Sequence, residues 1–587
     1  MPTLHWIGKE KVVNHHLEVP YRVLEHRFGY RADNAEDKSA TDSGNMIIHG
    51  DNLEALKALL PEYEGKVKCI YIDPPYNTGN EGWVYNDNVN HPKIQKWLGE
   101  VVGKQEEDFT RHDKWLCMMY PRLKLLQRLL SDDGCIVISI GFHELGNLLF
   151  LCREVFYNKQ IVPVTVQTSG GKPSSGFNYT QEYLVFVTPK DIKPNALDFC
   201  GGNERSPFEG LTLATFDKTQ RPNQTYPIFV NEVSGCFEGT GKSLQNLIDE
   251  GSYIGDKKDF VYDYSIAPKG CVAVWPITSK GKECVWRQIA DRLKNDWEKG
   301  YIKISKNKST SSMNKFSIQY LPSGVISKIE TGELQIIGKE EGVPTLIFGD
   351  NQTVGGQIPT IWTEKDFYTS KGTELLKKVF PEVAKIFDYP KALPLILSVI
   401  SAITDKNSII LDSFAGSGTT AHAVLNLNKK DGGNRKFILV EMEDYADSIT
   451  AERVRRVMQG YADTEGTGGS FDYYELGETL FNADGTLNEA VGEDRIREYV
   501  YYTETKQHLS RKREDLNRYL LDTWNGVGYY LYYEPDHETA LTYDRLSIIR
   551  EKAERYIVYA DTCTIDKDYM TEKNIIFRKI PRDIQKF

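Results

Sequence analysis

Four residues at the end of one apolar strand could hold and activate a planar base. Residues 69–79 read Cys-Ile-Tyr-Ile-Asp-Pro-Pro-Tyr-Asn-Thr-Gly. Proline has no N–H and fixes its own φ, so Pro74 and Pro75 end the strand and leave carbonyl oxygens that can accept hydrogen bonds. With the carboxylate of Asp73 and the ring of Tyr76, they offer acceptors and a stacking surface to the exocyclic amino group of an everted nucleobase. The alternative is an ordinary Asp-Pro turn after a buried strand.

A second motif, far downstream, is a glycine-rich turn between a strand and a helix. The predicted strand Ser408–Leu411 runs into Asp412-Ser413-Phe414-Ala415-Gly416-Ser417-Gly418-Thr419-Thr420, and a helix is predicted from about Ser417 to Asn428. Glycines let the backbone approach a ligand closely, and the helix N-terminus offers unpaired N–H groups. The next predicted strand, Arg435–Val440, ends in Glu441, where a doubly wound fold places the acid that binds ribose hydroxyls. Together these features predict a cofactor that contains adenosine.

The turn lacks the lysine of a phosphate-binding P-loop, because Gly418-Thr419-Thr420 stands where Gly-Lys-Ser/Thr would be needed. An acid at Asp412 suits a ligand with a cationic amino group better than a pyrophosphate. S-adenosylmethionine carries such a group, so it is the cofactor that we expect.

The order of the two motifs resembles that of the β-type DNA amino-methyltransferases, most of all the modification (Mod) subunits of type III restriction-modification systems. Further segments that resemble this family are Gly50–Leu53, Asp73–Gly79, Trp115–Leu123, Gly134–Ile138, Gln181–Phe186, Phe387–Lys391, Tyr559–Asp561 and Asn574–Phe577. The resemblance implies a site-specific enzyme of restriction-modification, or a solitary methylase. It would transfer a methyl group from S-adenosylmethionine to adenine N6 of a flipped base in duplex DNA, without a covalent intermediate or a metal.

The motifs and the resemblance name the site residues. We expect catalytic roles for Asp73, Pro74, Pro75 and Tyr76, and cofactor binding by Asp51, Lys391, Asp412, Phe414, Ala415, Gly416, Ser417, Gly418, Thr419 and Glu441. The Asp73 carboxylate and the Pro74 carbonyl would accept both amine hydrogens, which complements the positive charge that develops on the nitrogen. Three assignments have an ordinary alternative: Asp51 as a helix N-cap, Lys391 as a surface lysine and Asp412 as a cap of the turn.

Other functions stay open at this point. Cytosine N4 could be the acceptor, although family members of that type usually carry Ser where this chain has Asp73. The chain could instead be a non-catalytic DNA-binding specificity subunit, or it could act on RNA.

The net charge of −11 does not by itself favour a nucleic-acid partner, but the distribution of charge matters more than the total. Between residues 269 and 315, eleven basic residues stand against four acidic ones, with Trp275, Trp286 and Trp297 among them. The tryptophans could stack on nucleotides or pack in a core, and the lysines could cover a solvated face. We expect double-stranded DNA to be the partner, and the expected DNA-binding residues are Asn77, Lys280, Lys282, Arg287, Lys303, Lys306 and Lys308.

Alternating strand and helix patterns predict an α/β fold, a Rossmann-like doubly wound methyltransferase sheet that is circularly permuted. The expected parts are an irregular N-terminal arm (1–40), a catalytic half (41–190), an inserted α+β target-recognition domain (191–360), a cofactor-binding half (361–465) and a small C-terminal α/β domain (466–587). We expect a charged helix over His508–Leu521 in the last part, and a lid or DNA-contacting loop over 80–112.

The resemblance also implies partners: a homodimer, and a restriction subunit with helicase and nuclease activity, since this chain has neither a P-loop nor an evident nuclease constellation. The sequence has no run of about 18 apolar residues and no charged-then-apolar leader, so we expect no membrane insertion, no secretion and a cytoplasmic location. The nine cysteines form no Cys-x-x-Cys pair, which argues for reduced thiols and against zinc.

Overall fold

The computed structural model divides into two compact units. Unit 1 comprises Met1–Leu197 and Gln357–Phe587, and unit 2 comprises Asp198–Gly356. The structure describes residues 3–33, 35–78, 96, 111–171, 176–197, 199, 207–278, 281–307, 312–332, 334, 336–348, 358–383, 387–511, 517–581 and 583–584. Within these ranges no helix is long and apolar enough to cross a membrane.

Unit 1 is built on an eleven-stranded sheet in the order β18-β6-β7-β5-β4-β19-β20-β3-β23-β1-β2. The strands are β1 (Arg22–Arg31), β2 (Ala35–Asp37), β3 (Met46–His49), β4 (Val67–Ile72), β5 (Leu130–Ile140), β6 (Gln160–Gln167), β7 (Gln181–Thr188), β18 (Ile361–Trp362), β19 (Ile409–Asp412), β20 (Lys436–Glu441) and β23 (Ser470–Thr479). From β5 through β4, β19, β20 and β3 to β23 all neighbours are parallel. Because β4 and β19 come from either side of the inserted unit, the sheet joins two distant segments, and the predicted permuted fold is confirmed.

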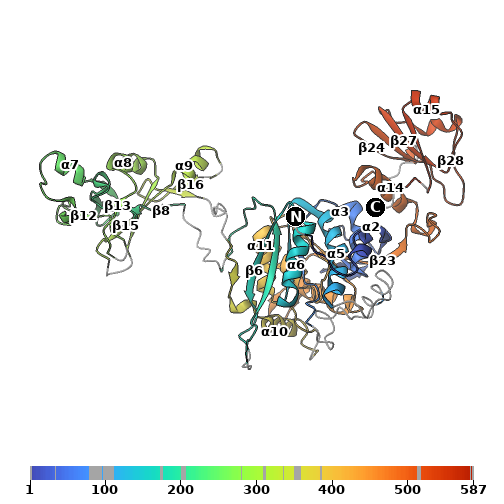
Figure 1. Cartoon of the computed structure of the whole chain (residues 1–587), viewed down its shortest axis with the longest axis horizontal. Helices are drawn as coiled ribbons and strands as arrows, with labels where there is room; N and C mark the ends of the chain where they lie inside the picture. Colours follow the sequence, from blue (N-terminus) through green and yellow to red (C-terminus); the bar gives the residue numbers. More distant parts are fainter. Residues whose placement is uncertain are drawn as a thin grey trace. The chain divides into compact units, whose positions relative to one another are not determined.

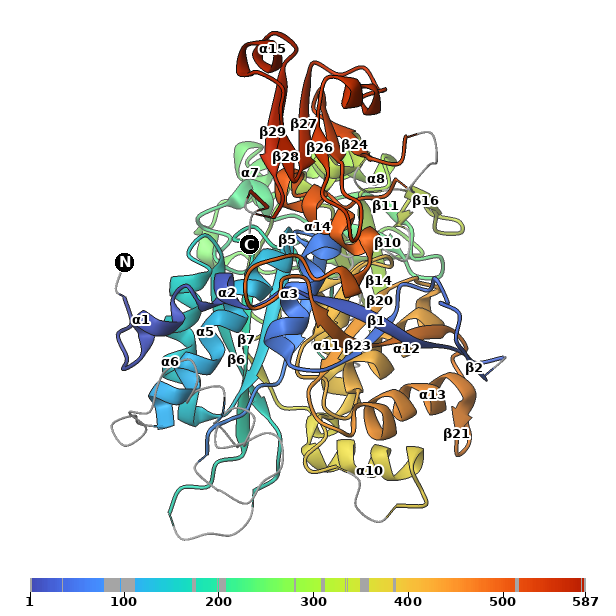
Figure 2. The same ribbon diagram turned by 90° about the vertical axis from the view of Figure 1, so that its right-hand side faces the viewer.

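Two groups of helices cover this sheet on opposite faces (Figures 1 and 2). One group is α3 (Asn52–Tyr63), α5 (Arg111–Leu129) and α6 (Phe142–Val155), and the other is α11 (Leu393–Ile403), α12 (Thr419–Asp431) and α13 (Glu452–Gln459). A strand covered on both faces must be apolar throughout. In β4 every residue except Lys68 is buried, and in β20 every residue except Lys436.

The prediction of an irregular N-terminal arm is wrong for residues 22–31, which form β1 and pair antiparallel with β23. The same pairing places β23 in the central sheet, although 466–587 was expected to be a separate domain. These two strands lie far apart in the sequence, so neither has a sequence neighbour that reveals its partner.

The charged helix predicted over His508–Leu521 is not found in the described part of that stretch, residues 508–511 and 517–521, and its remaining residues lie outside the described ones. Helix α14 (Glu493–Thr505) ends before this stretch, and strand β24 (Leu520–Trp524) begins at its end. Leu520 packs in one core with Tyr530 and Val558 of the same small sheet, whereas Leu521 packs in the main core of unit 1, so tertiary contacts decide the strand state of both residues. The small C-terminal sheet has the order β24-β25-β27-β29, with β25 (Val527–Leu531), β27 (Arg555–Ala560) and β29 (Ile575–Lys579).

Unit 2 is an α+β assembly of small sheets with short helices, drawn in green in Figure 1. Its elements are β8 (Glu209–Gly210), β9 (Thr212–Leu213), β10 (Ile228–Asn231), β11 (Phe237–Thr240), α7 (Leu244–Asp249), β12 (Cys271–Val274), β13 (Val285–Trp286), α8 (Ala290–Glu298), β14 (Ile302–Lys306), β15 (Phe316–Tyr320), α9 (Ser323–Glu330), β16 (Ile336–Lys339) and β17 (Leu346–Phe348). Trp275 and Trp286 are each 1% exposed, and Trp297 packs against the same core as Trp286. Trp275 and Trp286 are therefore core residues and do not form a nucleotide-stacking surface, whereas Trp297 is partly buried.

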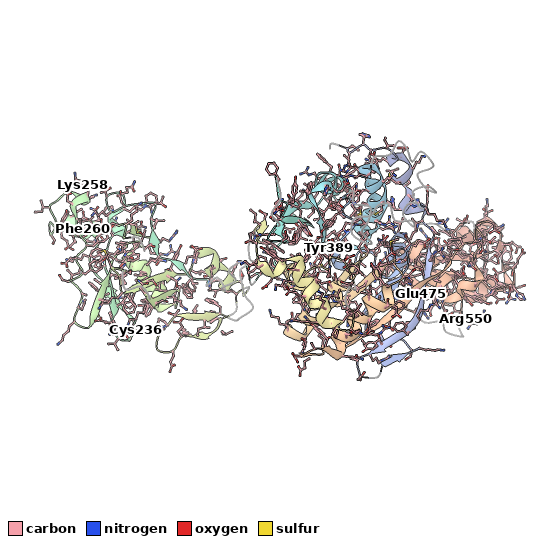
Figure 3. All side chains as sticks on the ribbon, turned by 90° about the horizontal axis from the view of Figure 1, so that it is seen from below. Cys236, Lys258, Phe260, Tyr389, Glu475 and Arg550 are labelled. Carbon is pink, nitrogen blue, oxygen red and sulfur yellow. The ribbon has the colours of Figure 1, made fainter. Side chains whose placement is uncertain are left out.

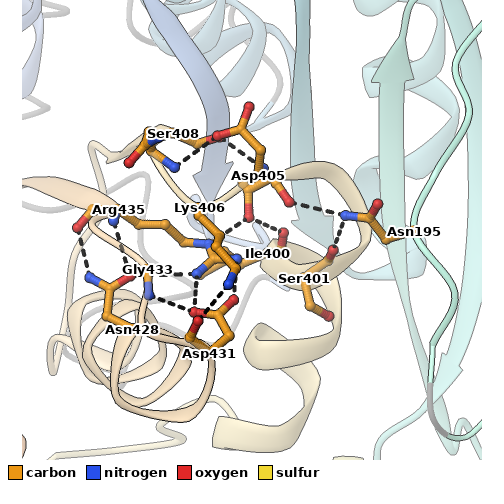
Figure 4. Close-up of polar contacts among 12 residues, drawn as sticks. Asn195, Ile400, Ser401, Asp405, Lys406, Ser408, Asn428, Asp431, Gly433 and Arg435 are labelled. Carbon is orange, nitrogen blue, oxygen red and sulfur yellow. Dashed lines mark hydrogen bonds and ion pairs between the residues drawn. The ribbon is translucent and has the colours of Figure 1, made fainter. Parts of the chain in front are cut away.

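Asn195 anchors the chain to unit 1 shortly before that unit's first segment ends (Figure 4). Its side-chain amide donates to the carbonyl oxygens of Ser401 at 2.8 Å and Thr404 at 3.0 Å, and its backbone N–H donates to Ala402. These carbonyls lie at the C-terminal end of α11, where a helix has no partners of its own for them.

Candidate active site

The two motifs lie side by side at the carboxyl edge of the sheet. In the register of the parallel strands β4 and β19, Cys69 is opposite Ile410 and Ile70 is opposite Leu411. Asp73 and Asp412 therefore end neighbouring strands, at the edge where open α/β sheets bind ligands. We call Asp73–Tyr76 the catalytic corner and Asp412–Thr420 the Gly-rich turn.

Contacts from three directions hold the Gly-rich turn. Gly416 has a φ of 53° and Gly418 a φ of 77°, which non-glycine residues rarely adopt. The Gly416 N–H donates to Glu441 Oε2 at 2.7 Å, and the Thr450 hydroxyl donates to the Gly416 carbonyl at 2.6 Å. Arg453, fully buried on α13, donates to the hydroxyls of the turn residues Ser417 and Thr419.

The catalytic half also reaches the Gly-rich turn. The side-chain amide of Asn52 donates to the Ser413 carbonyl at 3.1 Å, and Arg122 donates to the Asn52 side chain at 2.6 Å. Both Asn52 and Arg122 are 2% exposed. The two halves of the sheet are thus connected by a buried polar chain as well as by strand pairing.

A cavity of about 30 Å³ lies between the catalytic corner and the Gly-rich turn. It is lined by Tyr71, Asp73, Phe387, Tyr389, Pro390, Lys391, Asp412, Phe414, Ala415, Gly416, Ser417, Thr419 and Thr420. Tyr389, labelled in Figure 3, is 48% exposed, so it lies on the solvent side of this lining. Its φ is 54°.

Several residues expected to bind a cofactor make contacts that shape the turn. Asp51 is the N-cap of α3 and accepts from the backbone N–H of Leu53 at 2.8 Å. Asp412 accepts from the N–H of Phe414 at 3.0 Å and from the Thr420 hydroxyl at 2.5 Å, so it caps the turn. Burial raises the pKa of Asp412 to about 7. For Asp51 and Asp412, the structural alternative is the one observed.

In the catalytic corner, side chains from other elements hydrogen-bond to the proline turn and to the tyrosine. Trp115 of α5 donates its indole N–H to the Pro75 carbonyl at 2.7 Å. The Tyr76 hydroxyl donates to Glu182 Oε2 at 2.8 Å and lies 2.9 Å from the Ser139 hydroxyl. Within the described part of the chain, no donor is recorded at the Pro74 carbonyl, which leaves it as an acceptor.

Lys391 was expected at the carboxylate end of a cofactor, but its ammonium points into the catalytic corner. Its Nζ lies 3.1 Å from Asp73 Oδ1, 3.2 Å from Glu182 Oε2 and 2.8 Å from the Tyr76 hydroxyl. Burial opposes the ammonium form, but the two carboxylates outweigh it and raise the pKa of Lys391 to about 12. Burial also raises the pKa of Asp73, which Lys391 partly offsets.

Asn77 was expected to contact DNA, yet its side chain is 3% exposed and faces inward. Its amide donates to Glu144, which is fully buried, and to the Arg111 carbonyl at 3.1 Å. Glu144 also lies 2.6 Å from the His112 ring nitrogen Nδ1. Asn77 therefore fixes the turn after Tyr76, and this placement does not support a DNA contact.

The other expected DNA-binding residues lie in unit 2. Lys282, Arg287 and Lys306 are exposed, whereas Lys303 pairs with Glu340 at 2.7 Å. Lys280 and Lys308 lie outside the described residues, as does most of the stretch 80–112.

An exposed aromatic pair lies beside the catalytic corner. The rings of Phe142 and Tyr179 stack with centroids 4.1 Å apart and planes 7° apart, and they are 39% and 57% exposed. A Cβ on the preceding residue, Gly141, would come within 3.1 Å of the Tyr76 ring. Phe142 therefore directly follows a residue that lies against the Tyr76 ring of the catalytic corner.

Comparison with known proteins identifies the family. The model of the N6_N4_Mtase family, described as DNA methylase, matches residues 67–452, more than half of the chain. The chain belongs to this DNA methylase family. The match spans both the catalytic corner and the Gly-rich turn, and it includes unit 2.

Relatives of this DNA methylase confirm the resemblance to type III modification subunits. The chain is 30% identical to the EcoPI Mod subunit of Escherichia phage P1 over 75% of its own length and 64% of that protein. It is 28% identical to the type II methyltransferase M.KpnI of Klebsiella pneumoniae over 70% of this chain and 84% of that protein. A solved structure from Thermus thermophilus, described as a putative DNA modification methylase, matches 74% of this chain and 100% of its own length at 14% identity, with a TM-score of 0.30.

Sequence reasoning missed Glu182, Ser139, Arg453 and Asn52, which complete the site. Glu182 lies in a segment that resembled a strand near the base pocket, but nothing local shows that its carboxylate faces Lys391. Arg453 looks like one of several charged residues on an amphipathic helix. Among the described residues, no three His, Cys, Asp or Glu side chains are grouped as metal ligands.

Proposed function

We propose that the chain transfers a methyl group from S-adenosylmethionine to adenine N6 in duplex DNA. The observation that carries this proposal is the pairing of β4 with β19, which sets the catalytic corner beside the Gly-rich turn. A corner that accepts hydrogen bonds from an exocyclic amine is useful for methylation only if it faces a methyl donor.

The residues around the cavity fit the proposed cofactor. Phe387 and Phe414 offer flat apolar surfaces, and the start of α12 offers backbone N–H groups. The buried hydroxyl of Ser413 in the Gly-rich turn has no hydrogen-bond partner among the described residues. S-adenosylmethionine, when bound, supplies a methyl group activated by its sulfonium.

The chain's own residues then activate the amine. Asp73 and the Pro74 carbonyl accept the two N–H hydrogens, which frees the lone pair from the ring and complements the positive charge that builds on nitrogen. The nitrogen would receive the methyl group that the bound cofactor supplies, and Asp73 would accept the surplus proton from the nitrogen through their hydrogen bond. The Tyr76 ring stacks on the everted base, and Trp115 and Asn77 keep the corner in place for an in-line approach.

Duplex DNA is the proposed substrate, and two surfaces support its binding: the aromatic pair Phe142–Tyr179 and the exposed cations of unit 2. By analogy with its Mod relatives, we infer a homodimer that works with a restriction subunit. The chain spans 64% of the EcoPI Mod subunit, so this assembly is a proposal for the chain and not a property taken from the relative.

The test is expression in a host without DNA methylation, followed by sequencing that separates 6-methyladenine from N4-methylcytosine. We expect 6-methyladenine at one short recognition sequence, and none in cells that express Asp73→Ala. N4-methylcytosine at that sequence would replace the adenine assignment but keep the mechanism. Unmodified DNA from well-expressed, folded protein would contradict the proposal.

A further inference from the structure

At the catalytic corner, the ammonium of Lys391 is shared between two carboxylates. Its distances to Asp73 Oδ1 and Glu182 Oε2, 3.1 and 3.2 Å, are nearly equal. The Lys391 and Asp73 side chains are 10% exposed, and Glu182 is 23% exposed. Charges held in so little water interact strongly, so their sum affects any charge that forms nearby.

With both acids ionised and the lysine protonated, this group carries one net negative charge. Methyl transfer builds positive charge on the amine, so a net negative corner stabilises the transition state more than the ground state. A corner of Asp73 and Lys391 alone would be neutral. Glu182 therefore supplies the charge that Lys391 would otherwise cancel.

Building on the proposed function, we propose that Lys391 and Glu182 are positioning residues that set the charge of the catalytic corner. Lys391 keeps Asp73 ionised as an acceptor, and Glu182 takes over the ammonium when the amino group of the base hydrogen-bonds to Asp73. The ammonium stays in the corner during this exchange, because it also donates to the Tyr76 hydroxyl, which donates in turn to Glu182.

The surroundings of Asp73 show why it needs a cation. Burial raises the pKa of Asp73, and Lys391 is the largest influence against that rise. The other titratable groups that face Asp73 are Glu182, Tyr71, Tyr76 and Asp412. Burial raises the pKa of Asp412 to about 7, so Asp412 as well as Asp73 can affect the fall in rate at low pH, the acid limb of the pH–rate profile. The test therefore compares the position of the acid limb between variants.

The experiment measures single-turnover methylation of genomic DNA from a methylation-free host, with tritiated S-adenosylmethionine at saturation, from pH 5.5 to 9. For Lys391→Met we expect the acid limb to move to higher pH by one unit or more, because Asp73 loses its cation. For Glu182→Gln we expect a 10- to 100-fold slower rate across the range, because the corner becomes neutral and Lys391 competes with the amine for Asp73.

The double variant Lys391→Met/Glu182→Gln decides the matter. In the double variant the corner again has one net negative charge, from Asp73 alone. We therefore expect it to methylate DNA faster at pH 8 than Glu182→Gln does. Its acid limb should move to higher pH by less than that of Lys391→Met. Purely structural roles would instead give a double variant at least as impaired as the worse single variant, and that result would overturn the inference.

Two further measurements keep the outcomes separate. The pair Lys9–Glu154, 2.7 Å apart with side chains 13% and 20% exposed, is a matched ion pair on α1 (Lys9–Val12) and α6. Its variants Lys9→Met and Glu154→Gln should leave the pH profile in place. If Lys391→Met weakens cofactor binding more than tenfold in calorimetry with an unmoved acid limb, Lys391 serves the cofactor and the inference fails. If the wild type methylates no DNA, it is the proposed function that fails.

Discussion

Cys69 of β4 and Ile410 of β19 are register partners in neighbouring parallel strands, although one precedes the inserted unit and the other follows it. This single pairing turns two motifs that are weak alone into one site. An acid-proline turn or a glycine-rich turn occurs in many α/β proteins, but their meeting at one sheet edge supports the proposed transfer of a methyl group to an amine.

The left-handed backbone at the start of α12 should be needed for cofactor binding. A Cβ at Gly418, where φ is 77°, would lie 3.1 Å from the Thr450 carbonyl oxygen. We expect Gly418→Ala to weaken S-adenosylmethionine binding at least tenfold in calorimetry. The matched control is Gly432→Ala at the other end of the same helix, where φ is 65° and no atom lies within 4 Å. Gly432→Ala should lower the free energy of unfolding by about 1 kcal/mol, the cost of a left-handed backbone for an L-residue, but should bind the cofactor normally. Equal binding losses in both variants would refute the role of the turn.

Asn77 should control catalysis through the backbone and not through DNA. Its φ of 56° favours Asn or Gly, and its amide is held by buried Glu144. We expect Asn77→Ala to slow methylation by about 10-fold or more, since a misplaced reacting group costs rate steeply, while DNA affinity in fluorescence anisotropy stays within twofold. Asn77→Gly restores the backbone freedom and should recover part of the rate. A variant that loses DNA affinity before it loses rate would show that Asn77 contacts DNA after all.

The stability of the Gly-rich turn should depend on pH through Asp412. Its pKa of about 7 in the folded protein exceeds the ordinary value near 3.8, so the folded state holds the proton more tightly than the unfolded state. Stability from this group is then greatest below pH 4 and falls as pH rises to 7, by about 1.4 kcal/mol for each unit of pKa difference. We expect Asp412→Asn to flatten the fall of the unfolding temperature between pH 4 and 7, measured by scanning fluorimetry.

Asp431 provides the control of opposite sign for that experiment. Its ion pair with Arg435, 2.8 Å long, and its hydrogen bonds hold its pKa below the ordinary value (Figure 4). Its contribution is therefore present at neutral pH and is lost as the pH falls toward that lowered pKa. We expect the unfolding temperature of Asp431→Asn to lie below that of the wild type at neutral pH, and this difference to become smaller as the pH falls toward the lowered pKa of Asp431. If the difference between Asp412→Asn and the wild type also becomes smaller as the pH falls, burial is not the main influence on the pKa of Asp412.

The aromatic pair should strengthen DNA binding. Base stacking on an exposed ring is worth about 1–3 kcal/mol, so we expect Phe142→Ala to weaken binding of duplex DNA by 5-fold or more in anisotropy. Phe150→Ala is the matched control, since Phe150 lies on the same helix α6 and is 44% exposed. Both variants should bind S-adenosylmethionine as the wild type does. Equal DNA affinity of the two variants would remove the pair from the proposed DNA surface.

Local signals in the sequence already determined the framework of the site. The predicted strands Ser408–Leu411 and Arg435–Val440 are found one residue further along, as Ile409–Asp412 and Lys436–Glu441, because turn residues border their apolar runs and end a strand wherever it is placed. The catalytic corner and the Gly-rich turn were recognisable for a similar reason: proline and glycine act on the backbone of their own residues.

Only the tertiary structure decided which side chains serve these motifs. The place of β1 beside β23, the strand state of Leu520 and the burial of Trp275 and Trp286 all depend on partners distant in sequence. The same holds for Lys391, which a pattern reads as a surface or cofactor lysine but which packing places between Asp73 and Glu182. Charge and burial at that point arise from three separate segments, and no single segment contains the information that they meet.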